Sequence, residues 1–177
     1  MMKKTLALSP NALLGVLLIA VIVTAGLVGF FWSPWDPARI NILSRLQAPG
    51  AEHWFGTDEY GRDVLSRILL GASASLMISV ITVCFSLSAG IVLGLISGYL
   101  RGVTDRIIMM VTDTLLAFPG ILLALGLLSI LGNNRYGIIL ALGLAYTPSV
   151  VRIVRGTVMG LREADFVAAS RVMGHSE

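Results

Sequence analysis

Residues 72–99 read ASASLMISVITVCFSLSAGIVLGLISGY, a stretch without a single charged residue. It is longer than the roughly 20 apolar residues with which a helix crosses a bilayer, so it predicts a transmembrane helix. Small residues recur along it at four-residue steps, at Ser86, Gly90, Gly94 and Gly98. Residues four apart share a helix face, and a face with so little side-chain bulk lets a neighbouring helix pack closely against it. The stretch therefore predicts a helix packed tightly among others inside a membrane.

The composition of the whole chain is that of an integral membrane protein. Hydrophobic residues make up 56% of it and charged residues 13%, whereas soluble domains average about 45–50% and about 25%. Three more apolar segments accompany residues 72–99: one at residues 11–32, one that ends at Leu131, and one at residues 137–158. The sequence thus predicts an all-α fold, a polytopic bundle of four transmembrane helices.

The first apolar segment has two interpretations. Lys3 and Lys4 precede a charge-free run that lasts until Asp36. This pattern fits a cleavable signal peptide, with residues 23–25 (Val-Thr-Ala) as the cleavage site, and it also fits a retained membrane anchor. The apolar run continues beyond residue 25 and ends in Phe30, Phe31 and Trp32, aromatic residues typical of a membrane interface. We therefore favour the anchor.

Residues 33–70 have the composition of an extramembrane loop, with prolines, aromatic residues and charges of both signs. Residues 63–70 can begin the helix that continues into the second apolar segment. We divide the chain on this basis into an N-terminal anchor and loop, residues 1–71, and a transmembrane domain, residues 72–177.

The loop also contains residues of the types that build metal or acid–base sites, namely His53, Asp58, Glu59 and Asp63. Arg62 and Arg67 lie among them, and acids beside arginines form structural ion pairs more often than catalytic groups. We therefore predict ion pairs in the loop, and we assign no catalytic, metal-binding or cofactor-binding residue.

Polar residues and prolines mark the third and fourth segments. Asp113 lies within the third, where an acid is costly unless it is paired or wet, so we expect it to pair with an arginine near the interface; the alternative is a water-filled path. Arg152 and Arg155 end the fourth segment, and their head groups are expected to reach the interface. Pro119 and Pro148 are expected to kink the two helices.

The basic residues predict the orientation of the chain. Four crossings place both termini on one side, and cytoplasmic loops carry an excess of lysine and arginine. One side holds the larger set: Lys3, Lys4, Arg101, Arg106, Arg152, Arg155, Arg162 and Arg171. The other side holds Arg39, Arg45, Arg62, Arg67 and Arg135. The N-terminus and the segment after residue 158 are therefore predicted to be cytoplasmic.

Several classes of chemistry are excluded by missing residues. The only lysines are Lys3 and Lys4, so the chain has no phosphate-binding loop with its lysine, and it has no CxxC, HExxH or GxSxG motif. The single cysteine, Cys84, allows no internal disulfide. The basic residues are dispersed, which argues against nucleic-acid binding. We predict a transport component rather than an enzyme, with membrane lipid around it.

The last stretch, residues 161–177, reads LREADFVAASRVMGHSE and predicts an amphipathic helix outside the membrane. Phe166, Ala169, Val172 and Met173 follow at three- and four-residue steps and form an apolar stripe. Small residues in this helix, followed by a helix-ending glycine, allow another protein's groove to approach closely. We interpret the stretch as a docking element.

Three blocks of sequence resemble, in order, the inner-membrane permeases of ABC importers of the dipeptide, oligopeptide and nickel family. They are HWFGTDEYGRDVLSRILLGASASL (53–76), ISGYLRGVTDRIIMMVTDTLLAFP (96–119) and DFVAASRVMG (165–174). In this family the last block is the EAA loop, whose coupling helix docks into a groove on the ATPase subunit. The resemblance places the motif E-A-A-x-x-x-G on Ala168, Ala169, Ser170 and Gly174, with Phe166 before it. Alanine here replaces the acid and serine the second alanine, so a salt bridge from the first position is lost.

The resemblance implies partners and a substrate class. ABC ATPase subunits would dock on the cytoplasmic side, a second permease subunit would complete a heterodimer, and an extracytoplasmic solute-binding protein would deliver peptides, or alternatively nickel, at the cell inner membrane. The family pattern continues beyond Gly174 with two further spans, so we expect the chain to be the front part of a six-helix permease. The competing hypotheses are an ion-coupled carrier or channel, and a fragment that does not transport.

Overall fold

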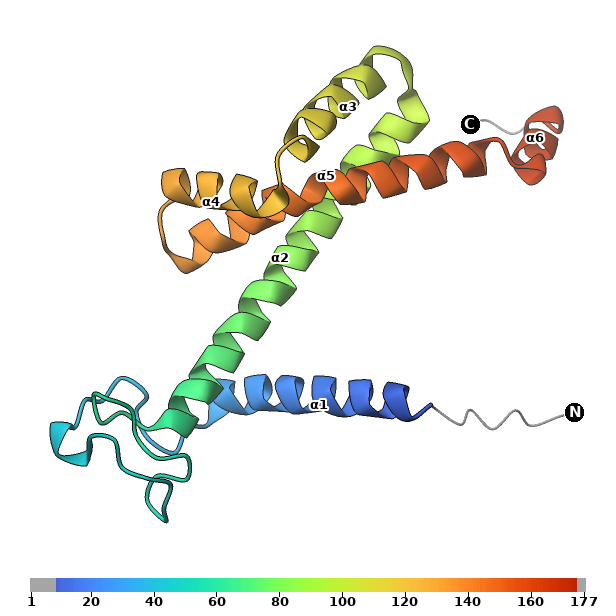
Figure 1. Cartoon of the computed structure of the whole chain (residues 1–177). Helices are drawn as coiled ribbons and strands as arrows, with labels where there is room; N and C mark the ends of the chain where they lie inside the picture. The colour runs from blue at the N-terminus through green and yellow to red at the C-terminus, as the bar shows by residue number, and fades with distance from the viewer. Residues whose placement is uncertain (1–8, 175–177) are drawn as a thin grey trace, which may run out of the picture. The chain divides into compact units, whose positions relative to one another are not determined.

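The computed structural model describes residues 9–174, and in these residues the regular structure is helical apart from one isolated bridge between Thr57 and Asp63. The helices are α1 (Pro10–Phe31), the 3₁₀ helix η1 (Ile42–Ser44), α2 (Val64–Leu100), α3 (Gly102–Leu116), α4 (Gly120–Leu131), α5 (Arg135–Arg162) and α6 (Asp165–Val172), as Figure 1 shows. The predicted all-α fold is confirmed. The chain forms two compact units, residues 1–77 and 78–177, and α2 belongs to both. That residues 72–177 act as one transport domain stays a prediction.

Three helices are long and apolar enough to cross a membrane by themselves: α1, α2 and α5. Helices α3 and α4 meet this condition only as a pair, and they are bent by 95° at the break between them. At 37 residues and about 1.5 Å per residue, α2 is about 55 Å long, and it therefore extends well beyond a hydrocarbon core of about 30 Å.

The break between α3 and α4 differs from the kink expected at Pro119. Helix α3 ends at Leu116, and Pro119 has extended backbone angles (φ −55°, ψ 126°) and precedes the first residue of α4. Proline has no N–H to continue the helical hydrogen bonding, and it disfavours the helical conformation of the residue before it, Phe118. The third segment is therefore two helices rather than one bent helix.

In the first unit, two glycines let α1 pack against the beginning of α2. A Cβ atom at Gly26 would lie 2.9 Å from Leu76 Cδ2, and one at Gly29 would overlap the backbone of Leu69. The contacts move backward along α2 as they move forward along α1, so the two helices are antiparallel. The end of α1 and the beginning of α2 therefore lie at the same membrane face, with the loop of residues 32–63 between them.

In the second unit, α2 packs against α5 through the predicted glycine face. A Cβ atom would lie 2.5 Å from Val150 Cβ if added at Gly90, 2.7 Å from Val154 Cβ at Gly94, and 2.8 Å from Val158 Cβ at Gly98. The contacts advance together along both helices, so α2 and α5 run in the same direction.

This parallel arrangement determines how often the chain crosses the membrane. Two spans that run in the same direction require the segment between them to return to the starting side. Helices α3 and α4 are the helices of that segment, and they are apolar enough to cross only as a pair. We therefore assign them together as one broken span, which gives four crossings in the described residues.

Helix α5 provides the core of the second unit. Its buried residues are Gly137, Ile139, Ala141, Gly143, Ala145, Thr147, Pro148 and Val151. Asn134 caps its N-terminus by accepting a hydrogen bond from the Gly137 N–H at 2.8 Å. The helix continues through Pro148 to Arg162. Its buried residues lie between Gly137 and Val151, so the residues after Val151 extend a helix that is well packed in its first part.

Candidate coupling site at the end of α5

Polar side chains gather where the end of α2, the first turn of α3 and the end of α5 meet. We call this cluster the polar junction; it consists of Ser97, Tyr99, Arg101, Asp105, Arg155, Arg162 and Glu163. All of these residues belong to the second unit. The cluster connects helices that are far apart in the sequence, and α6 begins directly after it.

The strongest contact of the polar junction joins Asp105 of α3 to Arg155 of α5. Arg155 Nε donates to Asp105 Oδ1 at 2.6 Å, and Arg155 Nη2 donates to Oδ2 at 2.7 Å. Such two-pronged pairs fix both distance and orientation, and they are stronger than single hydrogen bonds. Ser97 of α2, which is fully buried, also donates to Oδ1. One carboxylate thus links three helices.

A second set of contacts joins the turn between α2 and α3 to the end of α5. Arg101 Nη2 lies 3.3 Å from Glu163 Oε1, and Arg162 Nη1 donates to the Tyr99 carbonyl oxygen at 2.7 Å. The Arg162 guanidinium lies 5.6 Å from the centre of the Tyr99 ring, within the range of a cation–π contact. These residues hold the end of α5 against the end of α2.

The turn itself has a strained backbone. Arg101 has φ +53°, and Gly102 has φ +65°. Positive φ is easily adopted by glycine but costs a residue such as arginine of order 1–3 kcal/mol. The contacts of Arg101 and its neighbours offset this cost, because they hold the turn in one conformation.

Asp113 also pairs with an arginine, as predicted. Its Oδ1 accepts a hydrogen bond from Arg152 Nη2 at 2.6 Å, and both side chains are 56% exposed. Arg152 and Arg155 each bind an acid on α3. That their head groups reach the interface stays a prediction.

Helix α6 follows α5 after a short turn. The Ala164 N–H donates to Leu161 O at 3.2 Å, and the Val167 N–H donates to Ala164 O at 3.0 Å, so the chain turns between the two helices. Phe166 is 66% exposed, Ala169 is exposed and Ser170 is half-exposed. Gly174 has φ +81°, the left-handed conformation with which glycine ends helices.

The residues predicted to dock an ATPase subunit thus lie together on one short segment. Phe166, Ala168, Ala169 and Ser170 are all in α6, and Gly174 follows it closely. Residues 175–177 of the predicted docking stretch lie outside the described residues. The helix exposes the apolar side chains of Phe166 and Val172, and Met173 directly after it is also exposed. Their docking role remains a prediction.

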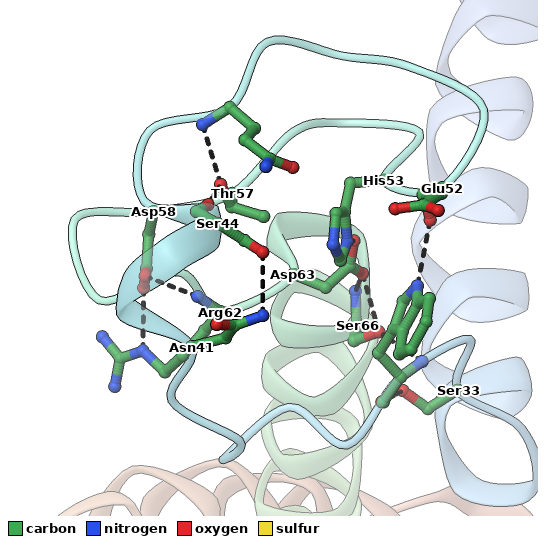
Figure 2. A network of polar contacts seen from close by, with 12 residues as sticks. Ser33, Asn41, Ser44, Glu52, His53, Thr57, Asp58, Arg62, Asp63 and Ser66 are labelled. Carbon is green, nitrogen blue, oxygen red and sulfur yellow. Dashed lines mark hydrogen bonds and ion pairs between the residues drawn. The ribbon is translucent and has the colours of Figure 1, made fainter.

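The loop of the first unit contains ion pairs, as predicted. His53 Nδ1 lies 2.9 Å from Asp63 Oδ1, and Asp63 Oδ2 accepts hydrogen bonds from the N–H and the hydroxyl of Ser66, both at 2.7 Å. Figure 2 shows these side chains together in the loop. Asp58 accepts from Arg62 Nε at 2.8 Å and also pairs with Arg67. Among the described residues, no group of three or more potential metal ligands is present.

The pKa values of the two loop acids are consistent with a structural role. Desolvation pushes the pKa of Asp58 upward, but hydrogen bonds from the Arg62 and Tyr60 N–H groups and from the Arg62 and Arg67 side chains outweigh it and hold the pKa below its usual value. Desolvation also pushes the pKa of Asp63 upward, and hydrogen bonds from Ser66 and His53 outweigh it. Both carboxylates are therefore ionised at neutral pH.

Sequence reasoning missed most of the polar junction. Arg155 was noted as a charge at the end of an apolar segment, but nothing in a single sequence pairs it with Asp105. The contacts of Ser97 and Tyr99 could not be predicted from the sequence, since serine and tyrosine near the end of a span are also common as packing and interfacial residues.

The fold and these contacts define a class: a multi-pass membrane protein whose last candidate span ends in a polar cluster and is followed by a short helix. Residues 90–177 match the family described as the inner membrane component of binding-protein-dependent transport systems. The chain belongs to this family, whose members are transport components rather than enzymes.

Curated relatives extend the similarity over nearly the whole chain. The dipeptide transport system permease protein DppC of Alkalihalophilus pseudofirmus is 37% identical over 97% of this chain and 56% of its own length. The probable D,D-dipeptide permease DdpC of Escherichia coli is 37% identical over 89% of this chain and 54% of its own. The nickel permease NikC of Escherichia coli is 35% identical over 91% and 58%. The chain thus spans little more than half the length of these relatives.

Proposed function

We propose that the chain is a permease subunit of an ABC importer and forms part of a path for dipeptides or oligopeptides across the cytoplasmic membrane. Its family and the names of its relatives support this assignment. A nickel permease of nearly the same identity makes nickel the second candidate substrate. In both cases ATP hydrolysis belongs to a separate ATPase subunit, a second permease completes the path, and a solute-binding protein delivers the cargo.

The observation that carries the proposal is the exposed helix α6 at the end of α5. Phe166 of this helix is 66% exposed, and Met173, directly after the helix, is 70% exposed. Helix α6 is not among the candidate spans. Large exposed apolar side chains on a short helix mark a surface for a partner. The small residues Ala169 and Ser170 allow that partner's groove to approach the helix backbone.

The orientation is also part of the proposal. Because α2 and α5 are parallel, α6 lies on the same membrane face as the end of α2. The basic residues Arg101, Arg106, Arg152, Arg155 and Arg162 gather on this face, which is expected to be cytoplasmic. The N-terminus is then cytoplasmic too, and the loop of residues 32–63 is outside.

The polar junction can transmit movement of α6 to the membrane spans. Closure of an ATPase dimer would move α6, and a rigid connection is needed to carry that movement into the spans. The Asp105–Arg155 pair connects α5 to α3, and Arg101 and Arg162 connect the turn after α2 to the end of α5. ATP would shift the equilibrium between inward-open and outward-open states by binding one of them more tightly.

Replacing Ala169 with arginine is expected to weaken docking of the ATPase subunit. A long charged side chain on the exposed face of α6 would keep the groove of the ATPase from approaching and would bury an unpaired charge. Co-purification of the ATPase subunit with the tagged permease from detergent-solubilised membranes is expected to fall at least about tenfold, which corresponds to about 1.4 kcal/mol.

Ala48→Arg is the matched control, because Ala48 is an exposed alanine in the loop, on the opposite side of the membrane in the proposed orientation. It should leave recovery of the ATPase subunit unchanged. If Ala169→Arg leaves recovery of the ATPase subunit undiminished at equal amounts of permease, α6 is not the docking helix.

A further inference from the structure

The loop between α1 and α2 presents a group of large aliphatic side chains to the outside. Ile40, Ile42, Leu43 and Leu46 are 59%, 75%, 95% and 66% exposed. They lie on and around the 3₁₀ helix η1, and we call them the aliphatic turn. Apolar residues gathered this closely on a surface mark a site of interaction rather than chance exposure.

The aliphatic turn is held firmly by the rest of the loop. The Asn41 N–H donates to Tyr60 O, and the Leu46 N–H donates to Asp58 O, both at 3.1 Å. Asn41 Nδ2 donates to Ser44 Oγ at 2.8 Å, and a side chain at Gly61 would overlap the Asn41 carbonyl. The exposed side chains are therefore presented by a fixed scaffold, and they do not simply belong to a loosely held segment.

Leu46 adds a sign of strain. Its φ is +52°, a conformation that is uncommon for any residue other than glycine, asparagine or aspartate and costly for a large aliphatic one. A bulky residue in such a conformation, and exposed in addition, lowers the stability of the loop by itself. Strain of this kind is typical of positions with a function.

The position of the loop indicates what covers the aliphatic turn. The Trp35 N–H donates to Ser66 Oγ at 3.0 Å, which ties the segment after α1 to the first turn of α2. Gly29 of α1 packs against Leu69 of α2 in the same region. Both stems of the loop are thus the ends of membrane spans at one face, so the loop begins and ends at the bilayer surface.

The composition of the turn favours lipid over a protein partner. Its exposed apolar residues are isoleucine and leucine, whereas the energetically dominant residues of protein interfaces are enriched in tryptophan, tyrosine and arginine, with leucine under-represented. Arg39 directly precedes the turn, and Arg45 lies within it, next to Leu46. Arginines beside an apolar surface can place their aliphatic stems in the acyl region and their guanidinium groups at lipid phosphates.

We propose that the aliphatic turn inserts into the boundary between head groups and acyl chains of the adjacent leaflet, with Arg39 and Arg45 at the phosphates. The loop is then anchored to the membrane at a third place, besides its two stems. This proposal needs α1 and α2 to span the membrane, but it does not depend on the cargo or on docking at α6.

Fluorescence quenching in lipid nanodiscs tests the insertion directly. In the Cys84→Ser background, Leu43→Cys is labelled with the environment-sensitive dye NBD, and lipids carrying a doxyl group near the head of the acyl chain serve as quenchers. Ala51→Cys, an exposed residue of the same loop, is the control. We expect a blue-shifted emission and at least about twofold stronger quenching at residue 43 than at residue 51, because an inserted side chain lies about 5–10 Å inside the boundary.

Two variants and one addition sharpen the test. Arg39→Gln with Arg45→Gln should weaken quenching at residue 43 more in anionic than in zwitterionic lipid, with an unchanged unfolding temperature. Equal, weak quenching at residues 43 and 51 would overturn the proposal. So would shielding of residue 43 that occurs only after the solute-binding protein is added, because the surface would then be a protein-docking site.

Discussion

Replacing Gly94 with leucine is expected to lower the free energy of unfolding by about 1–3 kcal/mol or more, because α2 and α5 must move apart. A Cβ atom at this position would lie 2.7 Å from Val154 Cβ and 2.9 Å from Val151 O. One of these atoms is backbone, which cannot rotate away as the end of a flexible side chain can. Thermal unfolding in detergent, followed by scanning fluorimetry, measures the effect.

Gly71→Leu is the matched control for this prediction. Gly71 lies in the same helix, and a Cβ atom there would meet nothing within 4 Å. Since leucine has a higher helix propensity than glycine by roughly 0.5–1 kcal/mol, this change should stabilise the protein or leave it unaffected. Equal destabilisation by both substitutions would show that the close approach at Gly94 does not hold the helices together.

Replacing Arg155 with glutamate is expected to cost about 2–3 kcal/mol of stability. If the proposed function holds, it is also expected to uncouple ATP hydrolysis by the partner subunit from transport. The substitution removes both charge-assisted hydrogen bonds to Asp105 and places two acids opposite each other. The side chains of Arg155 and Asp105 are only 25% and 19% exposed, so solvent screens this repulsion weakly. The unfolding temperature and the ratio of substrate transported to ATP hydrolysed are the two measurements.

The second arginine pair provides the control. Arg152 and Asp113 are joined by a single hydrogen bond. Arg155 and Asp105 share two, and Asp105 is also bound by Ser97. Arg152→Glu should therefore have a much smaller effect than Arg155→Glu. The double exchange Asp105→Arg with Arg155→Asp should restore part of the lost stability and coupling. If Arg155→Glu and Arg152→Glu behave alike, the Asp105–Arg155 pair does not connect α3 to α5 in the way described.

Much of the fold could be predicted because each span has a simple signal. The predicted segments 11–32 and 137–158 correspond to Pro10–Phe31 and Arg135–Arg162, and residues 72–99 lie within Val64–Leu100. The helices extend beyond the apolar segments because hydrogen bonding along the backbone does not stop where hydropathy falls. Arg67, for example, precedes the apolar segment but lies inside α2, in agreement with the prediction that residues 63–70 begin this helix.

Other features could not be predicted because they depend on which helix faces meet. A proline such as Pro119 signals a disturbance of the helix, but the 95° angle between α3 and α4 is set by their packing on α5. The glycine face of α2 predicted close packing. The valines of α5 that it contacts could not be predicted, because nothing in the sequence distinguishes them from other apolar residues of the spans. The polar junction is of the same kind, since Asp105 could have paired with several arginines.

The predicted docking segment presents a mixed case. Phe166, Ala168, Ala169 and Ser170 were expected on one helix and lie on α6, although this helix ends at Val172, before the end of the predicted stretch. The turn at Glu163 and Ala164 that separates it from α5 was not anticipated. The apolar side chains of Phe166 and Val172 are exposed after this turn. The sequence of one chain cannot show what covers them, because the partner is a separate protein.

Site-specific photo-crosslinking from residue 166 tests the central claim most directly. Phe166 is replaced by the photoreactive amino acid benzoylphenylalanine in cells that also produce the ATPase subunit and the solute-binding protein of the same transport system. Docking at α6 predicts a light-dependent adduct with the ATPase subunit, which Ala169→Arg reduces. An adduct with the solute-binding protein instead, or none with an ATPase subunit that still co-purifies with the permease, would contradict the claim that α6 receives the ATPase on the cytoplasmic side.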